Sequence, residues 1–114
     1  MQLKTIALIG SGLSIIQSIL GFSISLFGAN IASIVLHIII AIIILVMSVL
    51  ALRASFSRTE KNLSLGCLVL AIIQILLGGA VYSFGSPALT IVHFLVALGL
   101  VSNFSVIYGM KLVK

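Results

Sequence analysis

Acidic side chains are nearly absent from this chain of 114 residues, which contains a single one, Glu60. A Ser-His-Asp triad needs a carboxylate and a hydrolytic metal site needs a third protein ligand, so the sequence argues against both kinds of enzyme. Proton-coupled export of cations also needs a carboxylate inside the membrane, which disfavours a transporter, although histidine can relay protons. The one cysteine, Cys67, has no disulfide partner within the chain and is interpreted as a small buried residue.

Charged residues of either sign make up 6% of the chain and leave two long stretches with none, residues 5–52 and residues 62–110. A membrane-spanning helix needs about 20 apolar residues, so each stretch is long enough for two spans and a turn. Turn-forming residues divide both stretches, at 27–30 (FGAN) and at 83–87 (SFGSP). Four spans cannot close a β-barrel. The sequence therefore predicts an all-α membrane protein, a four-transmembrane-helix bundle with helices at Thr5–Phe27, Ile31–Leu52, Leu63–Tyr82 and Ala88–Met110.

One sequence pattern occurs twice: IIQSILGFSISLFG at 15–28 is matched by IIQILLGGAVYSFG at 72–85. We therefore predict a single membrane domain, residues 1–114, built from two tandem helical-hairpin repeats. Repeat 1 covers about 5–52, a basic loop covers 53–62, and repeat 2 covers about 63–110. Because each hairpin crosses the membrane twice, the two copies have the same orientation and are related by a pseudo-two-fold axis along the membrane normal.

All six basic residues fall at one end of the predicted bundle: Lys4, Arg53, Arg58, Lys61, Lys111 and Lys114. The positive-inside rule then predicts a multi-pass protein of the cell membrane with both termini in the cytoplasm. Contact with the lipid bilayer and its anionic lipids explains the net charge of +5. These residues are few and lie next to helix ends, which disfavours a nucleic-acid partner. Glu60, between Arg58 and Lys61, is expected to be a solvated loop charge.

Two histidines, His37 and His93, lie within the predicted spans, where an ionisable side chain indicates a functional site. Each follows an outer turn by six or seven residues and is followed four residues later by an alanine, Ala41 or Ala97. The pseudo-two-fold axis therefore places two imidazoles opposite each other at one level, each above a small residue. This arrangement predicts a b-type haem, with His37 and His93 as its two metal ligands.

The repeated glutamines, Gln17 and Gln74, lie near mid-membrane on the helix faces that carry small residues. They have two possible roles. Either they belong to the cofactor site, as hydrogen-bond partners of a haem edge, an axial-ligand network or a quinone, or they clasp one another or a neighbouring backbone. Residues on the same two faces are Ser14, Ser18, Gly21 and Ser25 in the first helix, and Cys67, Ala71 and Gly78 in the third.

The segments IIQILLGG, SP and IVHFLVA, in this order, resemble the haem A synthase family. The resemblance implies a membrane domain in which each four-helix half holds a haem between histidines of its second and fourth helices. This chain is similar to one such half, and the matching positions are Gln74, Leu77, Gly78, His93 and Ala97, repeated as Gln17, Leu20, Gly21, His37 and Ala41. The family's catalytic half has a glutamate one turn before its first histidine, where this chain has Ile34. The resemblance therefore implies haem binding without haem A synthesis by this chain alone.

Two functions are consistent with these observations. The first is a bis-histidine haem protein for electron transfer, associated with a respiratory or oxidase-type complex and not an enzyme on its own. The second is a non-catalytic structural subunit of a larger membrane complex, in which the histidines are packing residues. Both predict other membrane subunits or further copies of the chain as partners.

Overall fold

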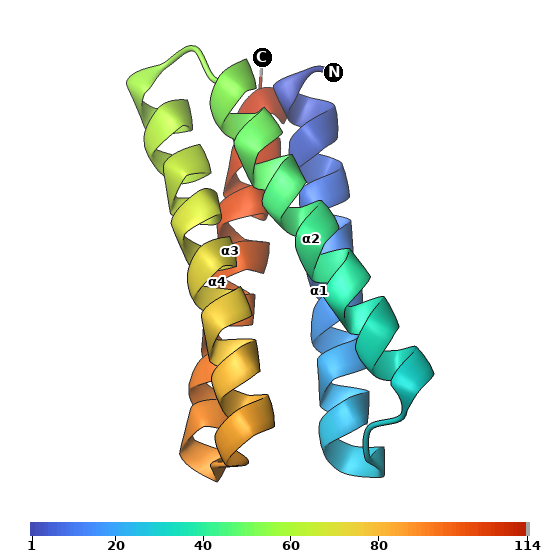
Figure 1. The fold of residues 1–114 in the computed structure, drawn as a ribbon. Coiled ribbons are helices and arrows are strands. Elements are labelled where there is room, and N and C mark those ends of the chain that lie inside the picture. Colours follow the sequence, from blue (N-terminus) through green and yellow to red (C-terminus); the bar gives the residue numbers. More distant parts are fainter. Residues whose placement is uncertain (114) are drawn as a thin grey trace.

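The computed structural model describes residues 1–113 and is helical throughout apart from short links (Figure 1). Its four helices are α1 (Leu3–Phe27), α2 (Ile31–Ala54), α3 (Arg58–Phe84) and α4 (Pro87–Leu112). Each is long and apolar enough to cross a membrane, and the described residues contain no strand. The longest dimension of the molecule is 43 Å, close to the thickness of a bilayer with its head-group regions, about 40–45 Å. The predicted fold class is confirmed, and the chain is a multi-pass membrane protein. Lys114, one of the six basic residues predicted to lie at one end of the bundle, is outside the described part of the chain.

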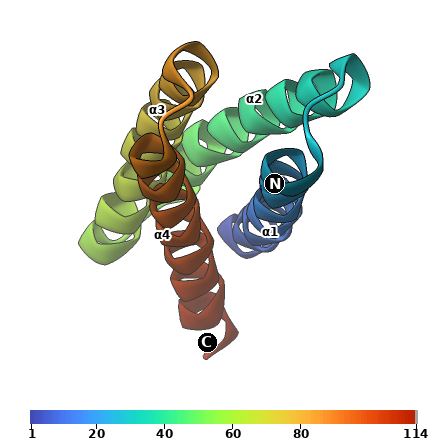
Figure 2. The same ribbon diagram turned by 90° about the horizontal axis from the view of Figure 1, so that it is seen from below.

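The helices run up and down and pack in a ring, so that α1 touches α2 and α4, and α3 touches α2 and α4 (Figures 1 and 2). Within the described residues no close backbone approach joins α1 to α3 or α2 to α4, which are the diagonal pairs. The start of α1, the end of α4 and the link between α2 and α3 lie at one end of the bundle, and the two hairpin turns lie at the other (Figure 1). We call these the basic end and the turn end.

The two hairpin turns follow from local chemistry. Gly28 and Gly85 end α1 and α3 with φ angles of 89° and 61°, a backbone region that favours glycine. Asn30 begins α2 with a reciprocal capping box to Ser33, and the Ser86 hydroxyl accepts the backbone N–H of Leu89 at the start of α4. The turns fall where the sequence predicts them because these residues satisfy backbone groups that a helix end leaves open.

The helices at the basic end are longer than predicted. α2 continues to Ala54 and α3 begins at Arg58, so that most of the predicted loop 53–62 is helical. Ser57 starts α3 through a capping box in which its hydroxyl accepts the N–H of Glu60, while the Glu60 carboxylate accepts the N–H of Ser57. The first turn of α3 therefore forms ahead of the apolar segment.

The prediction that Glu60 is a solvated loop charge is wrong. Glu60 is buried, with only 2% of its surface exposed. Its carboxylate accepts backbone N–H groups from Phe56 and Ser57 and forms an ion pair with the Lys111 ammonium of α4. These three donors replace the water that burial removes, which is the condition under which a buried charge is tolerated. The ion pair joins the first turn of α3 to the last turn of α4.

The packed core occupies the half of the bundle at the basic end. No residue at 18–39 or 72–96 is buried, whereas buried side chains occur on all four helices between these segments and the basic end. The tightest contact is between α1 and α4, where the fully buried ring of Phe104 lies on Gly10; a Cβ atom at Gly10 would be 2.5 Å from the ring. Towards the turn end the two hairpins diverge (Figure 1), and large apolar side chains on the outside of all four helices are exposed to the membrane.

Candidate functional site

His37 and His93 lie on the diagonal helices α2 and α4, at the level where the packed core ends. Each follows the N-cap residue of its helix by seven positions, from Asn30 to His37 and from Ser86 to His93. At a rise of 1.5 Å per residue, both histidines therefore lie about 10 Å from the turn end of their helices. Three residues link α1 to α2 and two link α3 to α4, which is why the histidines are one residue closer in sequence than the repeated glutamines.

The two imidazole rings approach each other across the bundle in an edge-on arrangement. Their centroids are 6.4 Å apart and their planes are inclined at 69°. A metal between two imidazoles needs two bonds of about 2 Å, and each nitrogen lies about 1.2 Å from its ring centroid, so coaxial ligands have centroids about 6.4 Å apart. The inclination does not oppose such ligation, because each ring can rotate about its own metal–nitrogen bond. The separation is therefore suited to one metal centre shared by both side chains.

Each imidazole rests on a glycine of the other helix in its own hairpin. A Cβ atom at Gly21 of α1 would lie 3.1 Å from His37 Cε1, and one at Gly78 of α3 would lie 3.4 Å from His93 Cε1. The two glycines occupy equivalent positions of the repeated sequence pattern. Glycine at these positions therefore leaves the space that the edge of each imidazole ring fills.

Five buried polar atoms, at the level of the histidines or closer to the basic end, lack a hydrogen-bond partner in the described structure. They are Nδ1 of His37 and His93, Oε1 of Gln17 and Gln74, and Oγ of Ser14. An unpartnered buried polar atom is costly and needs an explanation such as a bound group. The cluster combines atoms that can donate, the histidine nitrogens, with amide oxygens that accept.

The glutamines are only partly equivalent. Gln17 is 6% exposed and donates its amide N–H to the backbone carbonyl of His37 over 2.8 Å. This is the hydrogen bond to a neighbouring backbone that the sequence predicts as one of two possible roles. Gln74 is half-buried, and the described structure has no matching hydrogen bond from it to His93. The Gln17 side chain therefore lies against the segment of α2 that carries His37.

Ala41 and Ala97 lie one turn deeper than the histidines, where the core begins. Ala97 is buried with 6% exposed, and Ala41 is half-buried. One contact beside the site has no counterpart in the repeat: Phe22 of α1 packs against Phe94 of α4 with ring centroids 6.3 Å apart. The equivalent positions hold Gly79 and Ile38, so the repeated pattern gives no signal for this contact.

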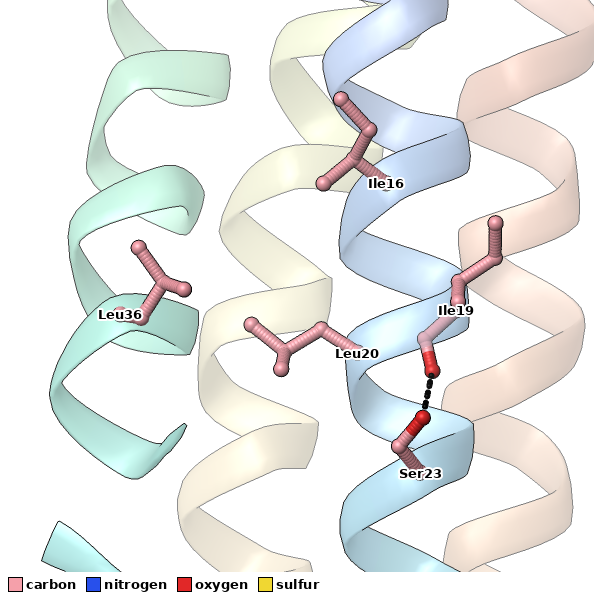
Figure 3. Close-up of a pocket in the computed structure, with 5 residues that line it drawn as sticks. All are labelled: Ile16, Ile19, Leu20, Ser23 and Leu36. Carbon is pink, nitrogen blue, oxygen red and sulfur yellow. Dashed lines mark hydrogen bonds between the residues drawn. The ribbon is translucent and has the colours of Figure 1, made fainter. Parts of the chain in front are cut away.

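An apolar groove lies between α1 and α2, and neither histidine lines it (Figure 3). It has a volume of about 300 Å³ and is lined by Ile16, Ile19, Leu20, Ser23 and Leu36. Its one hydroxyl, that of Ser23, donates to the backbone carbonyl of Ile19. The groove offers no free polar anchor and is exposed to the membrane, so it suits a lipid chain.

The donor set restricts which metal centres this site would suit. The described residues contain no group of three or more His, Cys, Asp or Glu side chains that could hold a bare ion. A structural zinc site uses four protein ligands and a catalytic one uses three. Haem iron already has four porphyrin nitrogens and takes only axial ligands from the protein, so two histidines complete it.

Comparison with protein-family models found no matching family, and searches of curated proteins and of solved structures found no match. The similarity to haem A synthases therefore rests on the quoted residues and stays a prediction.

Proposed function

We propose that this protein binds a b-type haem between His37 and His93 and serves electron transfer within the membrane. The observation that carries the proposal is the 6.4 Å separation of two imidazole centroids across the bundle, at one level and on diagonal helices. When bound, the haem would supply reversible one-electron chemistry at its iron. The residues of the chain would bind the iron, orient the ligands and exclude water.

The unpartnered atoms around the histidines support this assignment. A metal-bound histidine usually donates its other ring N–H to a carbonyl or carboxylate, which fixes the ring and its tautomer. Both histidines have a buried Nδ1 without a partner, and the two glutamines have buried amide oxygens without a donor. Gln17 already lies against His37 through its hydrogen bond to the backbone carbonyl. We therefore assign the glutamines as positioning residues for Nδ1–H, with Nε2 left to the iron.

The steric surroundings support the assignment as well. Gly21 and Gly78 lie against the ring edges, and Ala41 and Ala97 are small side chains one turn below the histidines, where a porphyrin face would lie. No side chain around the site is acidic, because the one carboxylate, Glu60, lies at the basic end. Low local polarity is one of the levers that set a haem potential.

The wider architecture belongs to the same proposal. We infer that the two hairpins are structural repeats, since each holds a histidine against a glycine of its own first helix. The concentration of basic residues at one end supports cytoplasmic termini in a cell membrane. A haem near the opposite face would need another membrane component as its electron partner, so the proposal includes association with a respiratory or oxidase-type complex.

The test is the absorbance spectrum of protein purified in detergent after expression with ample haem. We expect a reduced-minus-oxidised spectrum of low-spin haem that is lost in His37→Ala and in His93→Ala, because either change removes an axial ligand. Ile38→Ala and Leu95→Ala are matched controls, since both side chains lie near a histidine in sequence but are 52% and 59% exposed. The controls should keep the spectrum.

A colourless wild-type protein would refute the proposal and favour a structural subunit whose histidines pack against each other. Unchanged spectra in both histidine variants would refute the ligand assignment while leaving haem binding intact. Each variant should still purify as a monodisperse protein. This result would show that the variant has lost a ligand and not its fold.

A further inference from the structure

A cavity of about 510 Å³ opens at the basic end of the bundle, far from the histidines. Three parts of the chain line it: residues 1–4 at the start of α1, Ala54 and Phe56 around the end of α2, and Lys111 in the last turn of α4. The volume lies within the range of small-molecule binding sites, about 300–1,000 Å³. The cavity exists because the ends of α1, α2 and α4 meet here without a side chain that fills the space between them.

Among the described residues, Lys4 and Lys111 are the charged side chains that line the cavity. The charge of Lys111 is balanced by Glu60, so Lys4 carries the excess positive charge of the lining side chains. The Lys111 ammonium is held by the buried carboxylate of Glu60, and its side chain is 23% exposed. An ammonium has three N–H donors, so the ion pair fixes Lys111 in place and leaves donors for a ligand in the cavity. Glu60 directs its other oxygen to the backbone N–H groups of Phe56 and Ser57.

Apart from the two lysines and Gln2, the side chains of the lining are apolar. Leu3 is buried with 4% exposed and belongs to the core, whereas the ring of Phe56 is 89% exposed beside the opening. Phe56 follows the end of α2 and so presents an apolar ring at the end of a membrane span. The cavity therefore offers cations for an anion and apolar surface for the chain attached to it.

We propose that this cavity binds the phosphate head group of an anionic phospholipid, with Lys4 and Lys111 as the phosphate ligands and Phe56 beside the acyl chains. Basic recesses between spans on the positively charged side of membrane proteins recognise such head groups. The site is independent of haem binding, because none of its residues contacts the histidine pair.

The experiment uses the full chain in a neutral detergent and measures the shift in the thermal unfolding midpoint during a titration with dioleoylphosphatidylglycerol. Dioleoylphosphatidylcholine and inorganic phosphate are titrated in parallel. We expect phosphatidylglycerol alone to raise the midpoint. Lys4→Gln should weaken its apparent affinity about fivefold, the effect of one basic residue at an anionic surface, and Lys4→Arg should retain most of it. Lys61→Gln is the matched control, because it removes the same charge from an exposed side chain outside the cavity.

Three outcomes would overturn the proposal. An equal shift with phosphatidylcholine would mean that the stabilisation comes from acyl chains. Equal weakening in Lys4→Gln and Lys61→Gln would mean that net charge acts without a site. A full shift with inorganic phosphate alone would assign the cavity to a soluble anion instead of a lipid.

Discussion

The buried ion pair between Glu60 and Lys111 gives a quantitative test of the packing at the basic end. Glu60→Gln keeps an amide oxygen for the capping box but removes the charge that binds Lys111. Breaking a fully buried ion pair costs about 3–5 kcal/mol, and an exposed pair contributes about 0–1 kcal/mol. Glu60 is almost fully buried, but Lys111 reaches water with 23% of its side chain. We therefore expect Glu60→Gln to lower the free energy of unfolding by about 2 kcal/mol, an intermediate cost.

Glu60→Ala should cost about 1 kcal/mol more, because it also removes the helix cap. The assay is reversible unfolding in mixed micelles, followed by helical circular dichroism. Lys61→Gln, the neighbouring exposed charge, should change the stability by less than about 0.5 kcal/mol. The double variant Glu60→Gln with Lys111→Met completes a mutant cycle whose coupling energy we expect at about 1–2 kcal/mol.

The pH dependence gives an independent measurement of the same pair. Glu60 lies in the first turn of α3, outside the uncharged segment that begins at Asn62. The hydrogen bond from Lys111, followed by the one from the Phe56 backbone, lowers the pKa of Glu60 from 4.5 to about 2. Since the folded pKa is depressed, the stabilisation is complete above about pH 4.5 and is lost as the pH falls towards 2. The wild type should lose stability in this window and Glu60→Gln should not. A coupling energy near zero, or equal acid sensitivity in both proteins, would refute the reasoning.

Two further predictions concern close packing and orientation. Gly10→Ala should destabilise the protein by about 1–3 kcal/mol, because its Cβ would overlap the Phe104 ring. Gly12→Ala has open space around it and should stabilise the protein by about 0.5–1 kcal/mol. Equal changes in the free energy of unfolding, measured in detergent, would contradict the contact. The orientation can be tested in a background without the native cysteine. In oriented vesicles, Gln2→Cys should react with an impermeant thiol reagent only from the cytoplasmic side, and Ser86→Cys only from the other side. The reverse pattern would contradict the proposed orientation.

The positions of the hairpin turns could be predicted because they depend on local chemistry. Gly28 and Gly85 adopt positive φ angles, and Asn30 and Ser86 cap the helices that follow. The start of α3 could not be found in the same way, since the absence of charge marks where an apolar span begins and not where a helix begins. The pattern Ser57-x-x-Glu60 was the available signal, because it is a capping box.

The burial of Glu60 illustrates a limit of a different kind. Its partner Lys111 is 51 residues away in sequence, and the ion pair forms only because α3 and α4 are neighbours in the ring. A sequence with one acidic residue and several basic ones does not indicate which of them it meets. The neighbouring basic residues Arg58 and Lys61 suggested a solvated cluster, but the capping box directs the carboxylate inward to α4.

The histidine pair depends both on local sequence, which can be read directly, and on contacts between distant residues, which cannot. The common level of His37 and His93 follows from counting residues from the turns, and the glycine beneath each follows from the repeated pattern. The distance across the bundle does not, because it depends on how far the two hairpins diverge. Two contacts join the hairpins through α1 and α4, and the repeated pattern does not predict either: Phe104 lies on Gly10 in the core, and Phe22 packs against Phe94 beside the histidines. Because His93 directly precedes Phe94 in α4, a change at Phe22 that lets the hairpins move would alter the imidazole separation without touching either ring. We therefore expect the imidazole separation to depend on residues, such as Phe22, that the repeated sequence does not mark.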